Sequence, residues 1–365
     1  MPGKPVSVAH LIYGLNLGGL EQLVVHLAAR SRMRGIQTWI FALAHDGPVR
    51  ELARRQGVDV ELLPVHGLSL QALTGIRRKL EERAVTVLHA HDLGPWLNAA
   101  AVRVLRPSTR VLATFHEQRP PLGKKRHAAH AAARFTDALV ACGERVREDI
   151  LGWAPARARI PIIANGVPLE EQIPGARARA RAELGVPEGA VAVGYVGGLR
   201  EIKGPDRLLR AFLDKFAGRD DVHLYLIGAG TMEADLRRLA QGHANVHFPG
   251  LVMNAARVLP ALDVYAQTSL SEGRSLSMLE AMAAGLPTLA HDLLPVQEIH
   301  EHGATALLVP LGDRVALGAA LERLVSDPPL RARLGQTAQK RARLHSIEPM
   351  VDAYEALYRE LAARA

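Results

Sequence analysis

The sequence predicts an α/β protein with two Rossmann-like domains, each built on a parallel sheet. Short runs rich in Val, Ile and Leu alternate with longer runs of helical periodicity, a pattern typical of parallel strands joined by crossover helices. The chain has 365 residues, more than one ordinary core needs, and its hydrophobic content of 48% is enough for two. Open sheets of this kind bind ligands at the carboxyl ends of their strands. We therefore expect two sheets facing a central cleft that holds the functional site.

The first half of the chain shows seven runs typical of strands, with helical patterns between them. The strands are expected at 6–12, 38–43, 58–63, 85–89, 110–115, 138–141 and 159–163, and helices at, for example, 20–30, 49–56, 70–83 and 145–151. The turn Asn165-Gly166-Val167-Pro168 then interrupts the alternation. This places an N-terminal domain at residues 1–168, with a joint around 166–188.

A second α/β series follows and predicts a C-terminal domain at residues 169–345. Its strands are expected at 191–196, 223–227, 246–248, 264–266, 288–290 and 307–309, and its helices near 206–216, 232–241, 277–284 and 315–325. The last segment, 346–365, reads as one amphipathic helix with Tyr354, Leu357, Tyr358 and Leu361 spaced for burial. We expect this helix to pack back towards the N-terminal domain.

Composition excludes several classes of protein. Aromatic residues make up only 4% of the chain, which argues against stacking platforms for single-stranded nucleic acid. The single cysteine excludes a disulfide framework and a cysteine-based zinc site, and it fits a reducing cytoplasm. No run approaches the roughly 18 apolar residues of a membrane span, and no signal-peptide pattern precedes the first strand. We expect a cytoplasmic protein.

The formal charge of +8 comes with three groups of basic residues. They are Arg119, Lys124, Lys125, Arg126 and Arg134; then Arg145, Arg147, Arg157 and Arg159; and, at the expected joint, Arg177, Arg179 and Arg181. A solvated basic surface is the plainest interpretation. Docking on anionic lipid, at the inner face of the cell membrane, is the second. Nucleic-acid binding is the third, and no reading module supports it.

The most informative stretch is 271–287, which carries Glu272 and Glu280 eight positions apart. A fully helical interval of that length would separate them by about 12 Å, too far for an acid/base pair acting on one bond. The spacing suits two contacts on one long ligand, with helix-start N–H groups facing an anion between them. A nucleotide-sugar has that shape. The alternative is structural, because Ser277-x-x-Glu280 and Ser269-x-x-Glu272 both have capping-box spacing.

Two further sites have a functional and a structural interpretation. Lys203 precedes Gly204-Pro205, where a helix is expected to start, and a cation there is unfavourable unless an anion binds. Lys203 is thus a candidate diphosphate ligand, against a freely solvated lysine. Gly18 and Gly19 precede a helix that opens with Glu21. They allow close approach of a ligand phosphate or acceptor group, or they form a plain tight turn.

Several of these motifs together resemble the family-4 glycosyltransferases. The motifs are residues 193–199, Lys203-Gly204, 226–230, the two glutamates, 307–313 and Gly18-Gly19-Leu20-Glu21. The resemblance covers nearly the whole chain and is most specific between about residues 190 and 313. It implies a GT-B fold, a nucleoside-diphosphate sugar as donor substrate, retention of anomeric configuration, and no catalytic metal or other cofactor. It also implies that the N-terminal domain binds the acceptor and the C-terminal domain binds the nucleotide-sugar.

The resemblance assigns roles to individual residues. It implies that Glu280 holds the donor ribose, that Glu272 faces the transferred sugar, and that Lys203 meets the diphosphate. His116, at the end of a strand, would lie by the donor sugar. The implied catalytic residues are His116, Lys203 and Glu272, and the implied donor-binding residues are Gly18, Gly19, Gly197, Arg200, Lys203, Ser275, Leu276 and Glu280.

Three positions depart from the family pattern. Gly198 stands where the family has an arginine at the diphosphate, so that contact is missing unless Arg200 substitutes. Ser275 stands where a glycine is usual. A glycine pair whose amides meet the donor sugar falls at Leu294 and Pro295, and proline has no N–H to offer. The ribose end of the site is therefore better preserved than the sugar end.

The histidines raise one more hypothesis, a metal site formed by His89, His91 and His116. We reject it on the argument that alternating strand residues point to opposite faces, and expect no metal. The sequence thus predicts a retaining, metal-independent glycosyltransferase, acting on a carbohydrate or lipid-linked acceptor in cell-envelope polysaccharide or glycolipid synthesis. The alternatives are a catalytically degenerate nucleotide-sugar-binding or scaffold protein and a GT-B-like nucleotide-sugar epimerase.

Overall fold

The chain forms two compact units, each with its own sheet and core. The computed structural model describes residues 6–63, 67–117, 121–169 and 173–364. The first unit comprises Met1–Gly166 together with Ile347–Ala365, and the second comprises Val167–Ser346. Arg119, which the sequence grouped with the first basic cluster, lies outside the described residues. Among the described helices, none has both the length and the apolar character needed to cross a bilayer.

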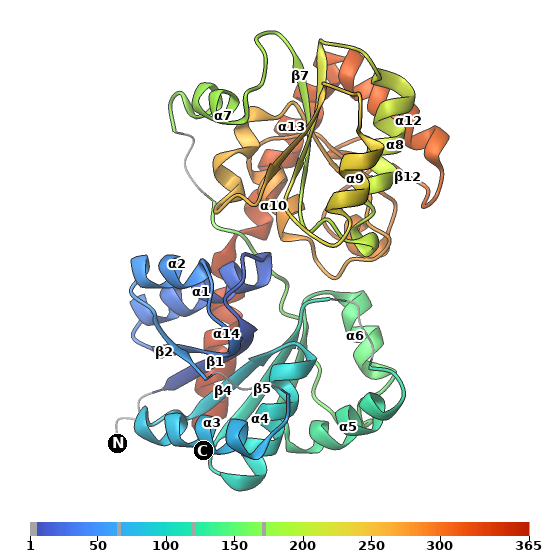
Figure 1. Cartoon of the computed structure of the whole chain (residues 1–365). Coiled ribbons are helices and arrows are strands. Elements are labelled where there is room, and N and C mark those ends of the chain that lie inside the picture. Colours follow the sequence, from blue (N-terminus) through green and yellow to red (C-terminus); the bar gives the residue numbers. More distant parts are fainter. Residues whose placement is uncertain (1–5, 64–66, 118–120, 170–172, 365) are drawn as a thin grey trace. The chain divides into compact units, whose positions relative to one another are not determined.

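The first unit is a six-stranded parallel sheet with helices on both faces (Figure 1). Its strands are β1 (Ser7–Gly14), β2 (Gln37–His45), β3 (Asp59–Leu62), β4 (Val87–His91), β5 (Arg110–Phe115) and β6 (Ala138–Ala141). Its helices are α1 (Gly19–Met33), α2 (Val49–Arg55), α3 (Leu70–Glu82), α4 (Leu93–Leu105), α5 (Lys124–Ala132), α6 (Glu144–Leu151) and α14 (Ile347–Ala362). The strand order is β3-β2-β1-β4-β5-β6, the order of a doubly wound dinucleotide-binding sheet.

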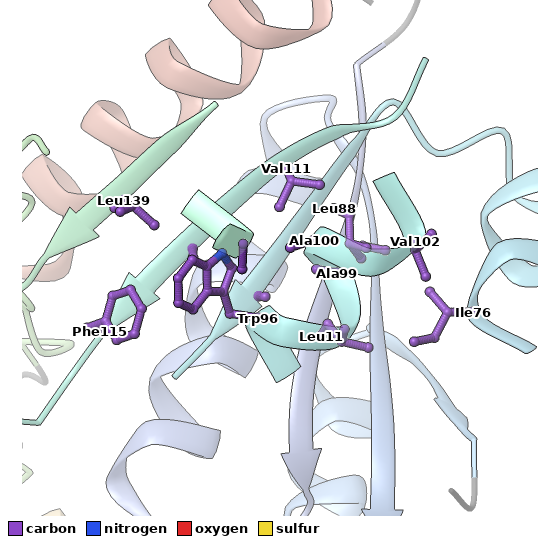
Figure 2. Close-up of a cluster of buried hydrophobic side chains, with 14 of the residues drawn as sticks. Leu11, Ile76, Leu88, Trp96, Ala99, Ala100, Val102, Val111, Phe115 and Leu139 are labelled. Atoms are coloured by element: carbon purple, nitrogen blue, oxygen red, sulfur yellow. The ribbon is translucent and has the colours of Figure 1, made fainter. Parts of the chain in front are cut away.

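Period-two alternation along the central strands divides this unit into two different faces. Leu11, Leu88 and Val111 point to one face and pack with Ile76 of α3 and Trp96 of α4 in an apolar core (Figure 2). The intervening residues point to the other face, which α1 and α14 cover. There the central strands carry polar side chains, and α14 contributes two fully buried tyrosines.

The segment 159–163 is not a regular strand, so that prediction was wrong. It makes an isolated bridge between Ile162 and Ala141 of β6, and the main chain at Arg159 and Pro161 accepts bonds from β6. Pro161 has no N–H to donate, which prevents a continuous ladder.

The second unit repeats the same topology. Its strands are β7 (Val191–Val196), β8 (Val222–Ile227), β9 (Val246–Gly250), β10 (Val264–Gln267), β11 (Thr288–His291) and β12 (Ala306–Val309), in the order β12-β11-β10-β7-β8-β9. Its helices are α7 (Ala176–Leu184), α8 (Pro205–Phe216), α9 (Glu233–Leu239), α10 (Leu276–Ala283), α11 (Leu294–Gln297), α12 (Arg314–Ser326) and α13 (Pro328–Ala342). Two parallel six-stranded sheets with alternating helices confirm the prediction of two Rossmann-like domains.

Most of the basic groups are neutralised locally. Arg177 and Arg181, placed by the sequence at the joint, lie on α7 within the second unit, and both contact Asp263. Arg145 and Arg147 pair with glutamates on their own helix, at 2.8 and 3.0 Å. Lys124, Lys125, Arg126 and Arg134 differ, because no ion pair joins them to an acidic side chain within the described part of the chain. The excess charge therefore concentrates on and around α5.

Candidate functional site

The candidate site of the second unit lies at its topological switch point. The strand order reverses between β7 and β10, so the loops that follow these two strands diverge there and leave room for a ligand. The loop after β7 contains a 3₁₀ turn, Glu201–Lys203, and leads into α8. The loop after β10 contains Glu272 and leads into α10. Lys203 and Glu272, predicted from separate motifs, therefore come from adjacent loops.

These two residues form a partly buried ion pair. Lys203 Nζ lies 2.8 Å from Glu272 Oε2, and the side chains are 17% and 4% exposed. A pair so shielded from water interacts more strongly than a surface pair, and removing one partner leaves a buried charge. The residues assigned to the diphosphate and to the transferred sugar are thus one hydrogen bond apart.

Two further side chains hold the Glu272 carboxylate: Gln267, which the sequence interpretation missed, and Ser269, which it considered only as a helix cap. Ser269 Oγ donates to Glu272 Oε1 at 2.6 Å, and the Gln267 amide donates to the same oxygen. Both donors are buried. A carboxylate that accepts several hydrogen bonds has a fixed orientation. The only signal in the sequence was their position, because Gln267 ends β10 and Ser269 follows it.

Close main-chain packing brings the two loops together. Gly204 has φ +59°, and a Cβ there would lie 2.3 Å from the Thr268 carbonyl oxygen. In the same region a Cβ on Gly228, φ +143°, would lie 1.9 Å from the carbonyl oxygen of Gly197. Only glycine fits at either position. Gly197 therefore contributes as part of a tightly packed loop.

Arg200 lies beside the position where the family's arginine is absent. A Cβ built on Gly198 would be 3.1 Å from Arg200 Nε, so the Arg200 side chain lies over Gly198. The nearby Tyr195 hydroxyl donates to the Gly198 carbonyl at 2.9 Å. Burial and the Glu272 charge raise the pKa of Tyr195, while Arg200 lowers it, which places all three groups in one electrostatic environment. The geometry is compatible with Arg200 replacing the missing cation.

The capping-box hypothesis is wrong for both glutamates, as the start of α10 shows. The N-cap of α10 is Ser275, whose hydroxyl accepts from Met278 N. Glu280 therefore lies beyond the first turn rather than at the third helical position. No helix starts at Ser269, whose hydroxyl donates to the Glu272 side chain. Residues 271–275 are loop, so a helical spacing of the two glutamates does not apply.

Leu276 lies at the start of α10, and Pro295 lies at the start of α11. Leu276 is the first residue of α10 and packs, half-buried, against a small apolar cluster. Pro295 lies in the first turn of the short helix α11, after Leu294, which is 59% exposed. Proline suits such a position because the first N–H groups of a helix have no partner within it. It cannot, however, donate there to a ligand.

In the first unit, the Gly18–Gly19 turn forms the start of α1. Gly18 is the N-cap with extended backbone, and a Cβ on it would lie 2.2 Å from Glu21 Oε2. The Glu21 carboxylate thus folds back over the helix start, as the tight-turn interpretation requires. A larger residue at position 18 would only displace the end of the flexible Glu21 side chain.

His116 follows β5 and belongs to a buried cluster of histidines. His10, His89, His91 and His116 are 0, 0, 2 and 9% exposed. Our argument against their meeting was wrong, because residues two apart on a strand point to the same face and His89 and His91 therefore do so. His10, which the sequence interpretation missed, joins them through the register that pairs it with His89. Three of these residues, His10, His89 and His91, have ring nitrogens within 4.8 Å of one another.

The strand end that carries His116 is held by Asp92. Asp92 has φ 63° and ψ 176°, a conformation that costs a non-glycine residue about 1–3 kcal/mol. Its carboxylate accepts from the main-chain N–H of His116 at 3.0 Å. Burial lowers the pKa of His116, and Asp92 and Asn165 oppose that shift. The strained turn thus fixes the position of His116.

Two family models match complementary parts of the chain. The model described as "Glycosyltransferase Family 4" matches residues 17–171, and "Glycosyl transferases group 1" matches residues 190–327. Among curated proteins, the D-inositol 3-phosphate glycosyltransferase of Nocardia farcinica is 29% identical over an alignment that covers 93% of this chain and 85% of that protein.

Two solved structures share the fold over nearly their full lengths. Anabaena HepE in complex with UDP-glucose has a TM-score of 0.82 and 19% identity, covering 96% of this chain and 99% of that one. WaaG, a glycosyltransferase involved in lipopolysaccharide biosynthesis, has a TM-score of 0.76 and 18% identity, with coverage of 96% and 99%. The fold is the two-domain GT-B architecture. The two family matches, on two units of this architecture, show that the chain belongs to the family-4, group 1 glycosyltransferases.

Proposed function

We propose that the protein is a retaining, metal-independent glycosyltransferase that uses a nucleoside-diphosphate sugar. The observation that carries the proposal is the buried Lys203–Glu272 pair at the switch point between β7 and β10. The location is where doubly wound domains bind nucleotides. The pair supplies a cation for a diphosphate and a carboxylate, held by two donors, for a sugar. Anabaena HepE, which has the same fold, binds UDP and UDP-glucose.

The proposed reaction transfers the sugar on the face from which the diphosphate leaves. The anomeric bond to the diphosphate oxygen breaks while the acceptor oxygen forms its bond to the same carbon, and the departing oxygen takes the acceptor's proton. Lys203, Arg200 and the N-terminus of α8 stabilise the charge on the leaving diphosphate. Glu272 stabilises the positive charge that develops at the anomeric carbon, and Glu280 binds the ribose. His116 orients the sugar or the acceptor.

The charges at this site support the proposal of metal independence. Lys203 and Arg200 provide fixed positive charge where other transferases place a divalent cation. Within the described part of the chain, the one group of three residues suited to hold a metal, His10, His89 and His91, belongs to the first unit rather than to this site.

We further propose an acceptor with an anionic or lipid-linked part, bound mainly by the first unit. The support is the charge around α5, where Arg126, His127, His130 and Arg134 line one pocket over the buried Trp153. Such clusters attract anionic headgroups. A role in cell-envelope polysaccharide or glycolipid synthesis, at the inner face of the membrane, would use this surface. Cosedimentation with anionic but not neutral liposomes, reversed by salt, tests it.

The first experiment is a thermal-shift screen against uridine, guanosine and adenosine diphosphate sugars. A ligand that binds only the folded protein raises the melting temperature with its concentration, and comparison of the bases identifies the donor class. Product stereochemistry, read by NMR from a transfer reaction with the identified donor, then tests retention. An inverted product would overturn the mechanism, and no shift with any donor would overturn the nucleotide-sugar assignment.

A donor-binding protein without transfer activity is the competing function, favoured by Pro295 in the first turn of α11. Saturable donor binding with no nucleotide release, in the presence of varied carbohydrate and lipid-linked acceptors, would support it. Pro295→Gly should then gain activity, because it restores a main-chain donor.

A further inference from the structure

Three of the four buried histidines in the cluster form a chain of hydrogen bonds. His10 Nδ1 lies 3.2 Å from His91 Nε2, and His91 Nδ1 lies 3.1 Å from His116 Nε2. The His10 and His91 rings are stacked with centroids 5.5 Å apart, as are those of His91 and His116 at 5.4 Å. The chain leads from the middle of β1 to the end of β5. It therefore connects a position deep in the sheet to the candidate catalytic histidine.

The side chains around it brace this chain. His89 lies beside His91 with ring centroids 4.1 Å apart, and its two nitrogens contact the Tyr358 hydroxyl at 2.7 Å and the Thr114 hydroxyl at 2.8 Å. Thr114 in turn contacts the Tyr354 hydroxyl at 2.9 Å. Both tyrosines come from α14. The sheet and α14 together leave little freedom for the imidazoles to rotate.

Neutral imidazoles in a row must all donate in the same direction. Each has one N–H and one acceptor nitrogen, so the direction at one end decides the tautomer at the other. Burial lowers the pKa of His10 to about 3 and holds that of His91 well below its usual range, so both are neutral near pH 7. The remaining question is which direction the chain takes.

The buried end at His10 decides the direction. His10 Nε2 has no hydrogen-bond partner. If the chain donated towards His10, this nitrogen would be a buried N–H without an acceptor. The opposite direction leaves a bare lone pair on His10 and places the terminal N–H on His116 Nδ1, which is also buried but lies beside the Asn165 side chain, whose hydrogen bond raises the pKa of His116. Orphaned donors are rarer in proteins than under-used acceptors. His10 Nδ1–H therefore donates to His91, and His91 Nδ1–H donates to His116 Nε2.

We propose that His10 and His91 are positioning residues that fix His116 as its Nδ1–H tautomer. His116 Nε2 is then an acceptor occupied by His91, and Nδ1 carries the proton beside Asn165. The inference rests on the proposed function, in which His116 orients the sugar or the acceptor. A wrong tautomer of a catalytic imidazole can cost about 10⁴ in kcat. The chain would keep His116 ready as a donor through Nδ1.

The charges that face His116 are consistent with this state. Asp92 and Glu117 raise the pKa of His116, and Asn165 does so through a hydrogen bond, while burial lowers it. Cys142, the residue after β6, donates from Sγ to the His116 carbonyl oxygen at 3.5 Å. The nearest imidazole, His91, is neutral. The hydrogen bond from His91 thus selects the tautomer without adding a charge.

A metal ion at His10, His89 and His91 is the alternative use of this cluster. Both nitrogens of His89 contact hydroxyl groups, and both nitrogens of His91 contact other histidines. Among the ring nitrogens of these three residues, only His10 Nε2 is without a partner. A metal site needs three or more lone pairs that converge on one point. The ring nitrogens of this cluster are used in hydrogen bonds, and metal binding would require the side chains to rearrange.

The test reads the tautomer directly, in the full-length protein labelled with ¹⁵N-histidine. Two-bond ¹H–¹⁵N correlation spectra distinguish N–H from bare ring nitrogens, and His116→Gln assigns the signals. We expect wild-type His116 to be neutral with its proton on Nδ1. A proton on Nε2, or an averaged mixture, would overturn the proposal. So would stoichiometric Zn²⁺ that persists after dialysis against chelator and removes the bare-nitrogen signals.

Paired substitutions of His91 separate positioning from structural support. His91→Asn keeps an amide donor near the former Nδ1 and should preserve the Nδ1–H tautomer of His116. His91→Gln moves the amide towards the former Nε2, so the tautomer should redistribute and kcat should fall at least about tenfold with an unchanged donor KM. An unchanged tautomer in a folded His91→Gln variant contradicts the proposal.

Two more variants keep the test decisive. If His91→Gln does not fold, His10→Gln against His10→Asn asks the same question one residue further away, with the same expected order. His26→Gln is the control, because His26 is also largely buried but bonds to Gln56, outside the chain. The tautomer does not depend on turnover. Loss of the Nδ1–H state would therefore defeat this inference alone, and a correct tautomer without any transfer would defeat the proposed function alone.

Discussion

At the scale of single residues, the ion pair between Lys203 and Glu272 is the feature on which the proposed function depends most. We predict that Lys203→Ala and Glu272→Ala each lower turnover by about 10²-fold or more, because each removes charge stabilisation needed in the transition state. Both variants should also melt at lower temperature, since each leaves an unpaired partner, at a cost of about 3–5 kcal/mol when fully buried. Glu272→Gln should recover only part of the stability, because its amide oxygen can still accept a hydrogen bond from Lys203 but carries no charge, and it should not recover turnover.

The control for this prediction is a pair of similar length on the surface. Lys215 and Glu322 are also 2.8 Å apart but are 34% and 55% exposed. Lys215→Ala should change stability by less than about 1 kcal/mol and leave turnover intact. Near-normal transfer by both site variants would remove the functional assignment of the pair.

A substitution of Glu280 distinguishes a ligand contact from a structural role. Because the N-cap of α10 is Ser275, Glu280→Ala removes no cap and should weaken nucleotide binding with little change in melting temperature. Asp327→Ala supplies the opposite control, since Asp327 caps α13 by accepting from Leu330 N at 2.9 Å. It should lower stability by about 1 kcal/mol and leave nucleotide affinity unchanged. Calorimetric titration and thermal melts of both variants decide between the two roles.

At the scale of elements, the start of α10 shows what a serine does in place of the family's glycine. The Ser275 hydroxyl caps the helix and also donates to Gln267 Oε1 at 2.9 Å, which links the helix to the amide that holds Glu272. We predict that Ser275→Ala lowers the free energy of unfolding by about 1 kcal/mol. Ser275→Gly should lower it by less, since glycine is a better N-cap than alanine. Ser69→Ala, at the N-cap of α3, is the matched control for stability. It should leave donor affinity unchanged, whereas Ser275→Ala should weaken it.

The same element shows where sequence interpretation works and where it stops. The strands at 110–115, 138–141 and 191–196 were predicted with their observed bounds, because a fully buried parallel strand is a continuous apolar run between turn residues. The start of α10 was predicted one residue late and its N-cap candidate, Ser277, two residues late, because Ser275 and Ser277 have equal capping propensity. In the structure the Ser275 hydroxyl accepts from Met278 N, whereas the Ser277 hydroxyl accepts from the buried Tyr265 hydroxyl at 2.8 Å.

The candidate sites divide in the same way. Lys203 and Glu272 were found because a motif places each at a strand end. Gln267 was missed because a neutral side chain at the end of a buried strand has no pattern of its own, and Ser269 was considered only as a helix cap. His10 was missed because its partners are decided by the register of β1 against β4, which no local signal encodes.

At the scale of the whole molecule, both units bury neutral histidines, and this predicts acid-sensitive folding. Burial lowers the pKa of His10 to about 3 and of His300 to about 3, from about 6.5 in the unfolded chain. Between about pH 3 and pH 6.5 these two histidines bind more protons in the unfolded state than in the folded state. The contribution to stability is therefore complete above about pH 6.5 and is lost as pH falls towards 3, by up to about 1.4 kcal/mol per pH unit for each group.

Denaturant midpoints measured from pH 7.5 down to pH 4 test this expectation. The stability should fall steadily over that range, and His300→Gln should flatten the dependence by removing one titrating group. A free energy of unfolding that is constant from pH 7 to pH 4.5 would contradict it. The effect should survive high salt, because its cause is desolvation rather than long-range charge.

The path of the chain has a consequence for how the protein is made. The second unit is an insertion in the first, and the two covalent connections pair with each other where Val167 bridges Ser346. During synthesis the second unit is complete before the ribosome reaches α14. Until α14 is made, the sheet face of β1 to β6 that carries the histidines stays uncovered. A nascent chain stalled before residue 347 would thus carry a complete second unit and an incomplete first unit. Chaperones should bind such a stalled chain through its N-terminal half.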